Sequence, residues 1–239
     1  MIPLADYEQH MSSANVRQLG PLAELFAEVV ALCNPSSIAI LGIGGGNGLD
    51  RIPPSGTSRI VGIDINPSYL DAVRQRYDKV FDLELHCIDL AEGLINAEPV
   101  QLVHAALVFE HAGVGKCLQN AISLVSHDGF LSVILQLPGT NTAKMVGDSG
   151  IESVRALEQQ FALIEPATLR DAVRGYGFRV AHEKLYSLDR GKGLWMGVFA
   201  RERGGQPPRR KVSDRSDQAD GRSHAECQSD HQREPDQPR

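Results

Sequence analysis

Five glycines stand within seven residues at Gly42–Gly48, directly after the short apolar run Ile38–Leu41. Glycine has no Cβ, so it adopts positive φ without a steric penalty and lets the backbone come close to a ligand. A sharp strand-to-helix turn can also use glycine, but one turn does not require five of them. The run therefore predicts a ligand-binding turn after the first strand of an α/β fold.

Strand and helix patterns alternate over the first 200 residues. Strands are expected at 38–41, 59–63, 83–87, 102–107, 130–137, 178–188 and 194–200. Helices are expected at 21–33, 67–76, 114–125, 151–161 and 168–174, with no full helix between the third and fourth strands. Near-continuous apolar strands separated by helices are typical of a parallel sheet that is covered on both faces. The pattern predicts one open, doubly wound α/β sheet that finishes in an antiparallel pair of strands.

Prolines mark several of the expected helix boundaries. Pro21 and Pro67 suit first helical positions, where a missing N–H costs nothing, and Asn66 is a good cap for the helix that follows it. Pro53 and Pro54 come soon after Gly48, so the helix behind the glycine run is expected to last only about one turn.

The C-terminal segment differs in composition from the rest of the chain. Residues 204–239 contain one large aliphatic residue, Val212, and no Phe, Trp or Tyr. Such a segment cannot bury enough apolar area to offset the entropy lost on ordering. We therefore expect a folded domain at 1–203 and a disordered tail at 204–239, with an interaction role for Arg209-Arg210-Lys211 as the alternative.

Charge and cysteine content limit the classes of partner. The first 200 residues carry 15 basic and 22 acidic side chains, so nucleic acid is not expected to be the main partner. Uncharged apolar runs fall short of the roughly 20 residues that a membrane span needs, and no secretory leader is visible. The four cysteines form no CxxC pair, which indicates reduced thiols in a cytoplasmic protein rather than a zinc site or a disulfide framework.

The spacing of glycines and acids indicates the kind of ligand. A dinucleotide fingerprint needs glycines at offsets 0, 2 and 5, and the third position falls on Asn47 or Leu49 instead. Asp64 ends the second expected strand, where a carboxylate can accept hydrogen bonds from both ribose hydroxyls. Asp89 follows the third strand and could accept from an exocyclic amine. A nucleoside ligand is predicted, and capping or loop roles for the two acids are the alternatives.

These segments resemble the class I S-adenosylmethionine-dependent methyltransferases over roughly residues 15–200. The resemblance rests on Ile38–Gly48, Val61–Asn66 and Cys87–Leu90. It implies a mostly parallel seven-stranded sheet with an antiparallel last strand, and S-adenosylmethionine as cofactor. By the same resemblance, Gly42, Gly44 and Gly46 would approach the methionine part of the cofactor, Asp64 would hold the ribose, and Asp89 would hold the adenine amino group. Ile65 and Leu90, which adjoin the two acids, are expected to line the same site.

One position departs from the family's pattern. An acidic residue often stands two positions before the first glycine, and this chain has Ile40 there. A water or another side chain must then hold the ammonium end of the cofactor.

The acceptor side is expected after the fourth strand. His111 could act as a general base, although a surface histidine is the plainer interpretation. Glu110 adjoins it, and Gln136 and Pro138 end the fifth strand. The segment Tyr7–Met11 resembles the cover that many family members place over the cofactor, with an unstructured terminus as the alternative.

The leading functional hypothesis is methyl transfer from S-adenosylmethionine to a small molecule. The glycine run is also similar to that of the polyamine synthases, so an aminopropyltransferase is the second enzyme hypothesis. A non-catalytic module that binds the cofactor is the third, because Ile40 replaces the acid. The glycine offsets disfavour a nicotinamide dehydrogenase.

Overall fold

The structure is a computed structural model, and it describes residues 1–53, 55–139, 149–155, 161–188 and 192–202. The predicted tail at 204–239 lies outside the described residues, as does the centre of the loop between the last two strands. No helix in the described part is both long and apolar enough to cross a membrane.

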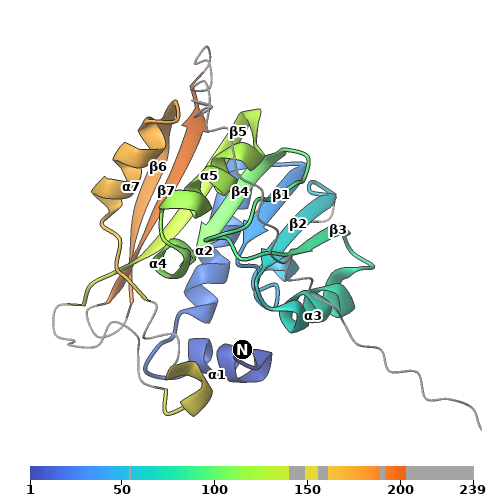
Figure 1. Cartoon of the computed structure of the whole chain (residues 1–239), viewed down its shortest axis with the longest axis vertical. Helices are drawn as coiled ribbons and strands as arrows, with labels where there is room; N and C mark the ends of the chain where they lie inside the picture. The colour runs from blue at the N-terminus through green and yellow to red at the C-terminus, as the bar shows by residue number, and fades with distance from the viewer. Residues whose placement is uncertain (54, 140–148, 156–160, 189–191, 203–239) are drawn as a thin grey trace, which may run out of the picture. The chain divides into compact units, whose positions relative to one another are not determined.

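A seven-stranded sheet forms the centre of the fold (Figure 1). Its strand order is β3-β2-β1-β4-β5-β7-β6, and β7 runs antiparallel to both of its neighbours. The strands are β1 (Ser37–Leu41), β2 (Arg59–Asp64), β3 (Asp82–Cys87), β4 (Val100–Ala106), β5 (Val125–Leu137), β6 (Phe178–Ser187) and β7 (Gly193–Arg201). The chain winds outward from β1 to β3 and returns to start β4 beside β1. The strand order therefore reverses between β1 and β4, and this confirms the predicted doubly wound sheet with an antiparallel last strand.

Helices and short turns connect the strands. They are α1 (Leu4–Ser12), α2 (Leu19–Cys33), η1 (Leu49–Arg51), α3 (Pro67–Tyr77), α4 (Phe109–Ala112), α5 (Gly115–Leu124), η2 (Glu152–Val154) and α7 (Pro166–Arg174). Asn66 caps α3 as predicted, since its side-chain oxygen accepts a hydrogen bond from Ser68 N–H at 3.1 Å. The helix after the glycine run is only the short 3-10 turn η1, which matches the one-turn helix expected before Pro53 and Pro54.

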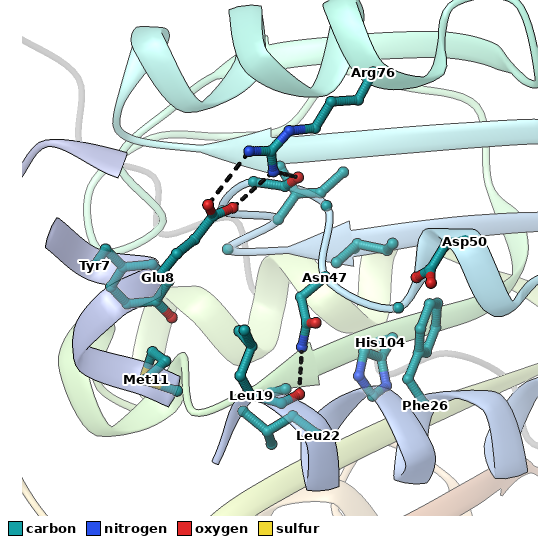
Figure 2. Close-up of a pocket in the computed structure, with 18 of the residues that line it drawn as sticks. Tyr7, Glu8, Met11, Leu19, Leu22, Phe26, Asn47, Asp50, Arg76 and His104 are labelled. Carbon is teal, nitrogen blue, oxygen red and sulfur yellow. Dashed lines mark hydrogen bonds and ion pairs between the residues drawn. The ribbon is translucent and has the colours of Figure 1, made fainter. Parts of the chain in front are cut away.

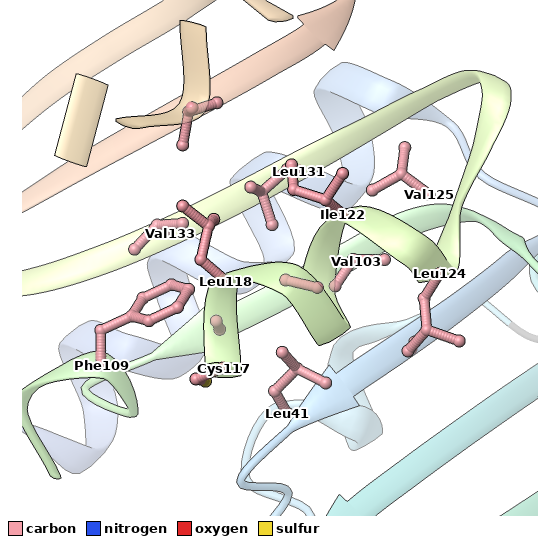
Figure 3. Packing of buried hydrophobic residues seen from close by; sticks show 14 of the residues in the cluster. Leu41, Val103, Phe109, Cys117, Leu118, Ile122, Leu124, Val125, Leu131 and Val133 are labelled. Carbon is pink, nitrogen blue, oxygen red and sulfur yellow. The ribbon is translucent and has the colours of Figure 1, made fainter. Parts of the chain in front are cut away.

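Both faces of the sheet are buried. On β1, Ala39 and Leu41 pack with residues of α5 and α7, and Ile38 and Ile40 pack with residues of α2 and α3. Figure 3 shows the first of these layers, where Leu118 and Ile122 of α5 lie against the sheet. The two apolar layers explain why the strand sequences are almost continuously apolar rather than alternating.

Some boundaries differ from the predicted ones. β5 begins at Val125, five residues before the predicted start, because a register shift opposite Val100–Leu102 takes the polar segment 126–129 into the strand. α2 begins at Leu19, so Pro21 is its third residue rather than its first; proline is still tolerated there, since N–H groups of the first turn have no partner within the helix. The helix predicted at 151–161 falls partly outside the described residues, and in the described part 152–154 form a 3-10 turn.

Candidate active site

The glycine run forms the turn after β1 at the point where the strand order reverses. Gly42 and Gly44 have φ values of 66° and 55°, which favour glycine. A Cβ on Gly42 would lie 2.6 Å from Cγ2 of Val108, so a side chain there would collide with the segment that follows β4. The turn therefore presents bare backbone at the ends of two adjacent strands.

Asp64 ends β2 and is held by this turn. Its Oδ2 accepts a hydrogen bond from Gly44 N–H and its Oδ1 accepts one from Asn66 N–H, both at 2.9 Å. The side chain is buried, and loss of solvation raises its pKa, while the backbone donors oppose that rise. The Ile65 N–H also stabilises the charged carboxylate. A carboxylate offers about four acceptor positions, so these three donors do not use all of them.

A cavity of about 480 Å³, here called the strand-end cavity, collects the predicted nucleoside-binding residues. Its lining includes Asp64, Ile65, Asp89, Leu90 and the turn residues Gly42 and Gly44. Asp89 is exposed, and its Oδ1 accepts a hydrogen bond from Ala91 N–H at 2.8 Å. The structure thus brings together both predicted acids and the apolar residue that follows each of them.

A second cavity of about 300 Å³, the glycine-loop cavity, lies against the same turn (Figure 2). Gly46 lines this cavity and not the strand-end cavity. Ile40 lines it too, so an apolar side chain stands where the family pattern often places an acid. Five residues line both cavities: Tyr7, Met11, Gly42, Gly44 and Ala106. The two cavities therefore lie on either side of one strip of residues.

The N-terminal helix α1 lies over this strip. Glu8 forms an ion pair with Arg76 of α3 at 2.7 Å, and Arg76 also donates to the carbonyl oxygen of Gly45 at 2.8 Å. At the other side, Ser153 donates to Asp6 at 2.5 Å. The predicted segment Tyr7–Met11 is therefore helical and tied to two separate parts of the chain, rather than an unstructured terminus.

The end of β4 carries His111. Leu107 has a φ of 57°, rare for a residue with a side chain, and it turns the chain from β4 into α4. His111 lines the strand-end cavity and makes an edge contact with Phe161, with ring centroids 5.2 Å apart. His111 is exposed to solvent in part, yet the protein around the imidazole lowers its pKa by desolvating the charged form. The ring is therefore largely neutral at pH 7 and able to accept a proton.

Glu110 is buried behind the cavity rather than lining it. Its Oε1 accepts a hydrogen bond from Gln136 N–H at 2.8 Å, while its buried Oε2 has no hydrogen-bond partner in the described part of the chain. Burial raises the pKa of Glu110 to about 7. The carboxyl group thus fixes the end of β5 and is only partly ionised at neutral pH.

Several residues on the acceptor side were not predicted from the sequence, although one of them is the partner of the predicted Gln136. Gln18 Nε2 donates to Gln136 Oε1 at 2.8 Å across 118 positions, and both side chains are buried at the cavity wall. Val16, Phe161 and Lys192 also line the cavity. They come from three distant segments, so no local spacing could have identified them. Of the predicted acceptor residues, Gln136 lines the cavity, whereas Pro138 is not among the described residues that line it.

The described residues fit an adenosyl cofactor. Two acids stand at the ends of adjacent strands, Ile65 and Leu90 adjoin them, and a glycine turn leaves room where a Cβ would intrude. Acceptors for hydroxyls and an amine beside apolar walls are the groups that a nucleoside requires.

Comparison with known proteins agrees with this geometry. Residues 38–129 match the model of a family described as methyltransferase domain, and that range includes β1 to β4, Asp64, Asp89 and His111. No curated protein matches the chain.

Solved structures share the fold at low sequence identity. The N-methyltransferase NodS from Bradyrhizobium japonicum WM9, in complex with S-adenosylhomocysteine, is 13% identical with a TM-score of 0.58, over 80% of this chain and 91% of that one. Coclaurine N-methyltransferase, bound to N-methylheliamine and S-adenosylhomocysteine, is 12% identical with a TM-score of 0.59, over 77% and 73%. The [4+2]-cyclase SpnF is 11% identical with a TM-score of 0.58, over 76% and 80%. Residues 38–129 therefore resemble a methyltransferase domain in sequence, and the chain as a whole shares the seven-stranded fold of these solved structures.

Proposed function

We propose that the protein transfers a methyl group from S-adenosylmethionine to a small-molecule acceptor. The observation that carries the proposal is the strand-end cavity, which joins Asp64, Asp89 and the glycine turn to His111 at one edge of the sheet. S-adenosylmethionine, when bound, supplies a methyl group on a sulfonium, which already has a good leaving group. The protein then has to bind, align and exclude water, and these contributions can supply several kcal/mol of rate enhancement.

Each cofactor-binding residue has a role in this proposal. Asp64 would accept hydrogen bonds from the ribose hydroxyls through the acceptor positions that its backbone donors leave open. Asp89 would accept from the adenine amino group through the oxygen that Ala91 does not use. Ile65, with 57% of its surface exposed, and the buried Leu90 would provide the apolar contact to the ring.

His111 is the proposed proton acceptor. It stands on the acceptor side of the cavity, and its lowered pKa keeps the imidazole neutral at pH 7. If the acceptor is a hydroxyl or a protonated amine, the imidazole would take the proton that the acceptor loses as the new bond to carbon forms. A small acceptor is supported by the cavity's size and by the small molecule bound to coclaurine N-methyltransferase.

Calorimetry tests cofactor binding directly. We expect S-adenosylhomocysteine and S-adenosylmethionine to bind in the micromolar range, roughly −7 to −8 kcal/mol. Binding of NAD in place of both nucleosides would contradict the proposal. Incubation with candidate acceptors and labelled S-adenosylmethionine then tests methyl transfer itself.

A binding protein without methyl transfer activity is the second candidate. The [4+2]-cyclase SpnF shares this fold, so the fold alone does not require methyl transfer. Bound S-adenosylmethionine that is not turned over with any acceptor class would favour this candidate. An aminopropyltransferase would need acids that hold a polyamine. On the acceptor side Glu110 is buried and is not among the residues that line the cavity, which disfavours this activity.

A further inference from the structure

His104 is a buried imidazole at the wall of the glycine-loop cavity. It lies on β4, where it is the register partner of Ile40 on β1 and of Ser132 on β5. Its Nδ1 is 3.1 Å from the Ser132 hydroxyl, and its ring packs against Phe26 with centroids 4.5 Å apart. The side chain is only 4% exposed, yet it lines the cavity beside Ile40 (Figure 2). A fixed polar ring therefore stands next to the position where the family pattern often has an acid.

The second ring nitrogen is the one available to a ligand. Ser132 occupies Nδ1, and no hydrogen bond to Nε2 comes from the described residues. Burial lowers the pKa of His104 to about 3, so the ring is neutral at any pH at which the protein is used. With the proton on Nδ1 and donated to Ser132 Oγ, Nε2 is a hydrogen-bond acceptor.

The proposed function indicates which part of the cofactor comes here. Asp64 and Asp89, the proposed ribose and adenine partners, both line the strand-end cavity and not the glycine-loop cavity. The strip of Gly42, Gly44 and Ala106 borders both cavities. A cofactor bound to the two acids therefore reaches the glycine-loop cavity with its amino-acid end. That end carries an ammonium group, which has only hydrogen-bond donors.

We propose that Nε2 of His104 accepts a hydrogen bond from the ammonium group of the cofactor and so replaces the carboxylate that is missing at Ile40. This inference rests on the proposed function, since it assumes that an S-adenosyl nucleoside is the ligand. His104 is a binding residue in this assignment, and Ser132 is a positioning residue that acts through it.

The charged groups that line the same cavity are less suited to this role. Glu8 is engaged by Arg76, which binds both of its carboxylate oxygens. Asp50 is exposed on η1, where water solvates it. Asp50 is therefore the competing candidate that the experiment has to separate from His104.

The test compares ligands that differ only at the amino-acid end, measured by calorimetry on the full chain. S-adenosylhomocysteine carries both the ammonium and the carboxylate. Its decarboxylated analogue keeps only the ammonium, and its deaminated analogue keeps only the carboxylate. The fourth ligand, 5′-methylthioadenosine, lacks both groups. In His104→Leu we expect the affinity for the two amine-containing ligands to fall about 10-fold or more, the usual effect of losing a hydrogen bond to a charged group. The affinity for the two ligands without the amine should change less than about twofold.

Ser132→Ala is the milder second variant, and it keeps the measurement usable if His104→Leu does not fold. It retains the ring but removes its anchor, so the same two ligands should lose about threefold in affinity. Val103→Ala serves as the stability control, because Val103 is buried on the opposite face of β4. Any destabilisation it causes should affect all four ligands equally.

Three results would overturn the assignment. One is an equal loss for all four ligands in His104→Leu; another is no loss for any of them. The third is a loss specific to the amine in Asp50→Asn but not in His104→Leu, which would assign the ammonium to Asp50. Failure of the unmodified protein to bind any of the four nucleosides would instead contradict the proposed function, so the two failures are distinguishable.

Discussion

The ends of β1 to β3 and the ends of β4 and β5 build the two halves of one cavity in different ways. The first half consists of backbone and short side chains at the strand ends or within three residues after them: Gly42, Gly44, Asp64 and Asp89. The second half is assembled from distant segments, for example the Gln18–Gln136 pair, which spans 118 positions. Under the proposed function, the first half would bind the cofactor and the second half the acceptor, so we call them the cofactor half and the acceptor half. A cofactor site can be encoded locally because its ligand is constant, whereas an acceptor site depends on how loops pack together.

The buried acid of each half shows the same contrast. Asp64 has a backbone N–H on each carboxylate oxygen, from Gly44 and from Asn66. The Glu110 Oε1 accepts from Gln136 N–H, but its Oε2 has no partner among the described residues. A buried carboxylate oxygen that lacks a partner makes ionisation costly, so Glu110 is expected to lower stability at neutral pH, whereas the backbone donors around Asp64 favour its charged form.

The largest effect is expected for Glu110→Gln. The folded pKa of Glu110 is raised to about 7 from an ordinary 4.5, so the unfolded chain ionises first as pH rises. Glu110 therefore costs stability progressively between pH 4.5 and about 7, and the loss is complete above that pH. The full loss is about 3 kcal/mol, at 1.36 kcal/mol for each pKa unit.

Urea unfolding at pH 5 and pH 8 measures this difference. The Gln variant keeps an oxygen for Gln136 N–H and should lose much less stability across that range than the unmodified protein. Glu183→Gln, at a partly exposed ion pair with Arg170, is the control and should leave the pH dependence nearly unchanged. Equal slopes for Glu110→Gln and the unmodified protein would show that Glu110 is ionised without cost.

The next effect concerns the acceptor half alone. His111→Ala should lower turnover by about 100-fold, the lower end of what a general base contributes, while cofactor affinity changes less than about twofold. The pKa of His111 lies below 6.5, so turnover of the unmodified protein should rise with pH through that value and then level off. The Ala variant should lack this rise. If His111→Ala abolished cofactor binding, the division between the two halves would be wrong.

Asp64→Ala should act on the cofactor half alone. Loss of a carboxylate that accepts two ribose hydroxyls should weaken S-adenosylhomocysteine binding by about 10- to 100-fold. Asp64→Asn should lose less, because one acceptor oxygen remains. Calorimetry with Asp71→Ala, an exposed acid on α3, provides the matched control. Unchanged affinity in Asp64→Ala would place the ribose on another residue.

The smallest effect is expected outside both halves. Truncation after Arg203 should leave the melting temperature within about two degrees, because residues 204–239 have little apolar surface to bury. Thermal unfolding followed by circular dichroism measures it. A drop of many degrees would show that the tail packs on the domain.

The sequence predicted the cofactor half closely. The seven strands and the cap at Asn66 are confirmed, and Gly42, Gly44, Asp64, Ile65, Asp89 and Leu90 line one cavity as expected. Their roles toward a cofactor stay predictions. The helix α1 was missed, because its short pattern is weak and its position depends on contacts with Arg76 and Ser153. The early start of β5 was missed because a register shift hides the polar segment 126–129 inside the strand.

The amino-acid sequence by itself determined which segments form strands and where the two acids lie relative to them. Strand ends, glycine turns and helix caps are set by residues that are neighbours in sequence, so a local pattern predicts them. Tertiary structure alone decided three things: that Glu110 is buried with one oxygen that no described residue satisfies, that Gln18 meets Gln136, and that His104 stands beside Ile40. Burial and register bring these side chains together across long separations, and burial also sets their protonation, so no local pattern could encode them.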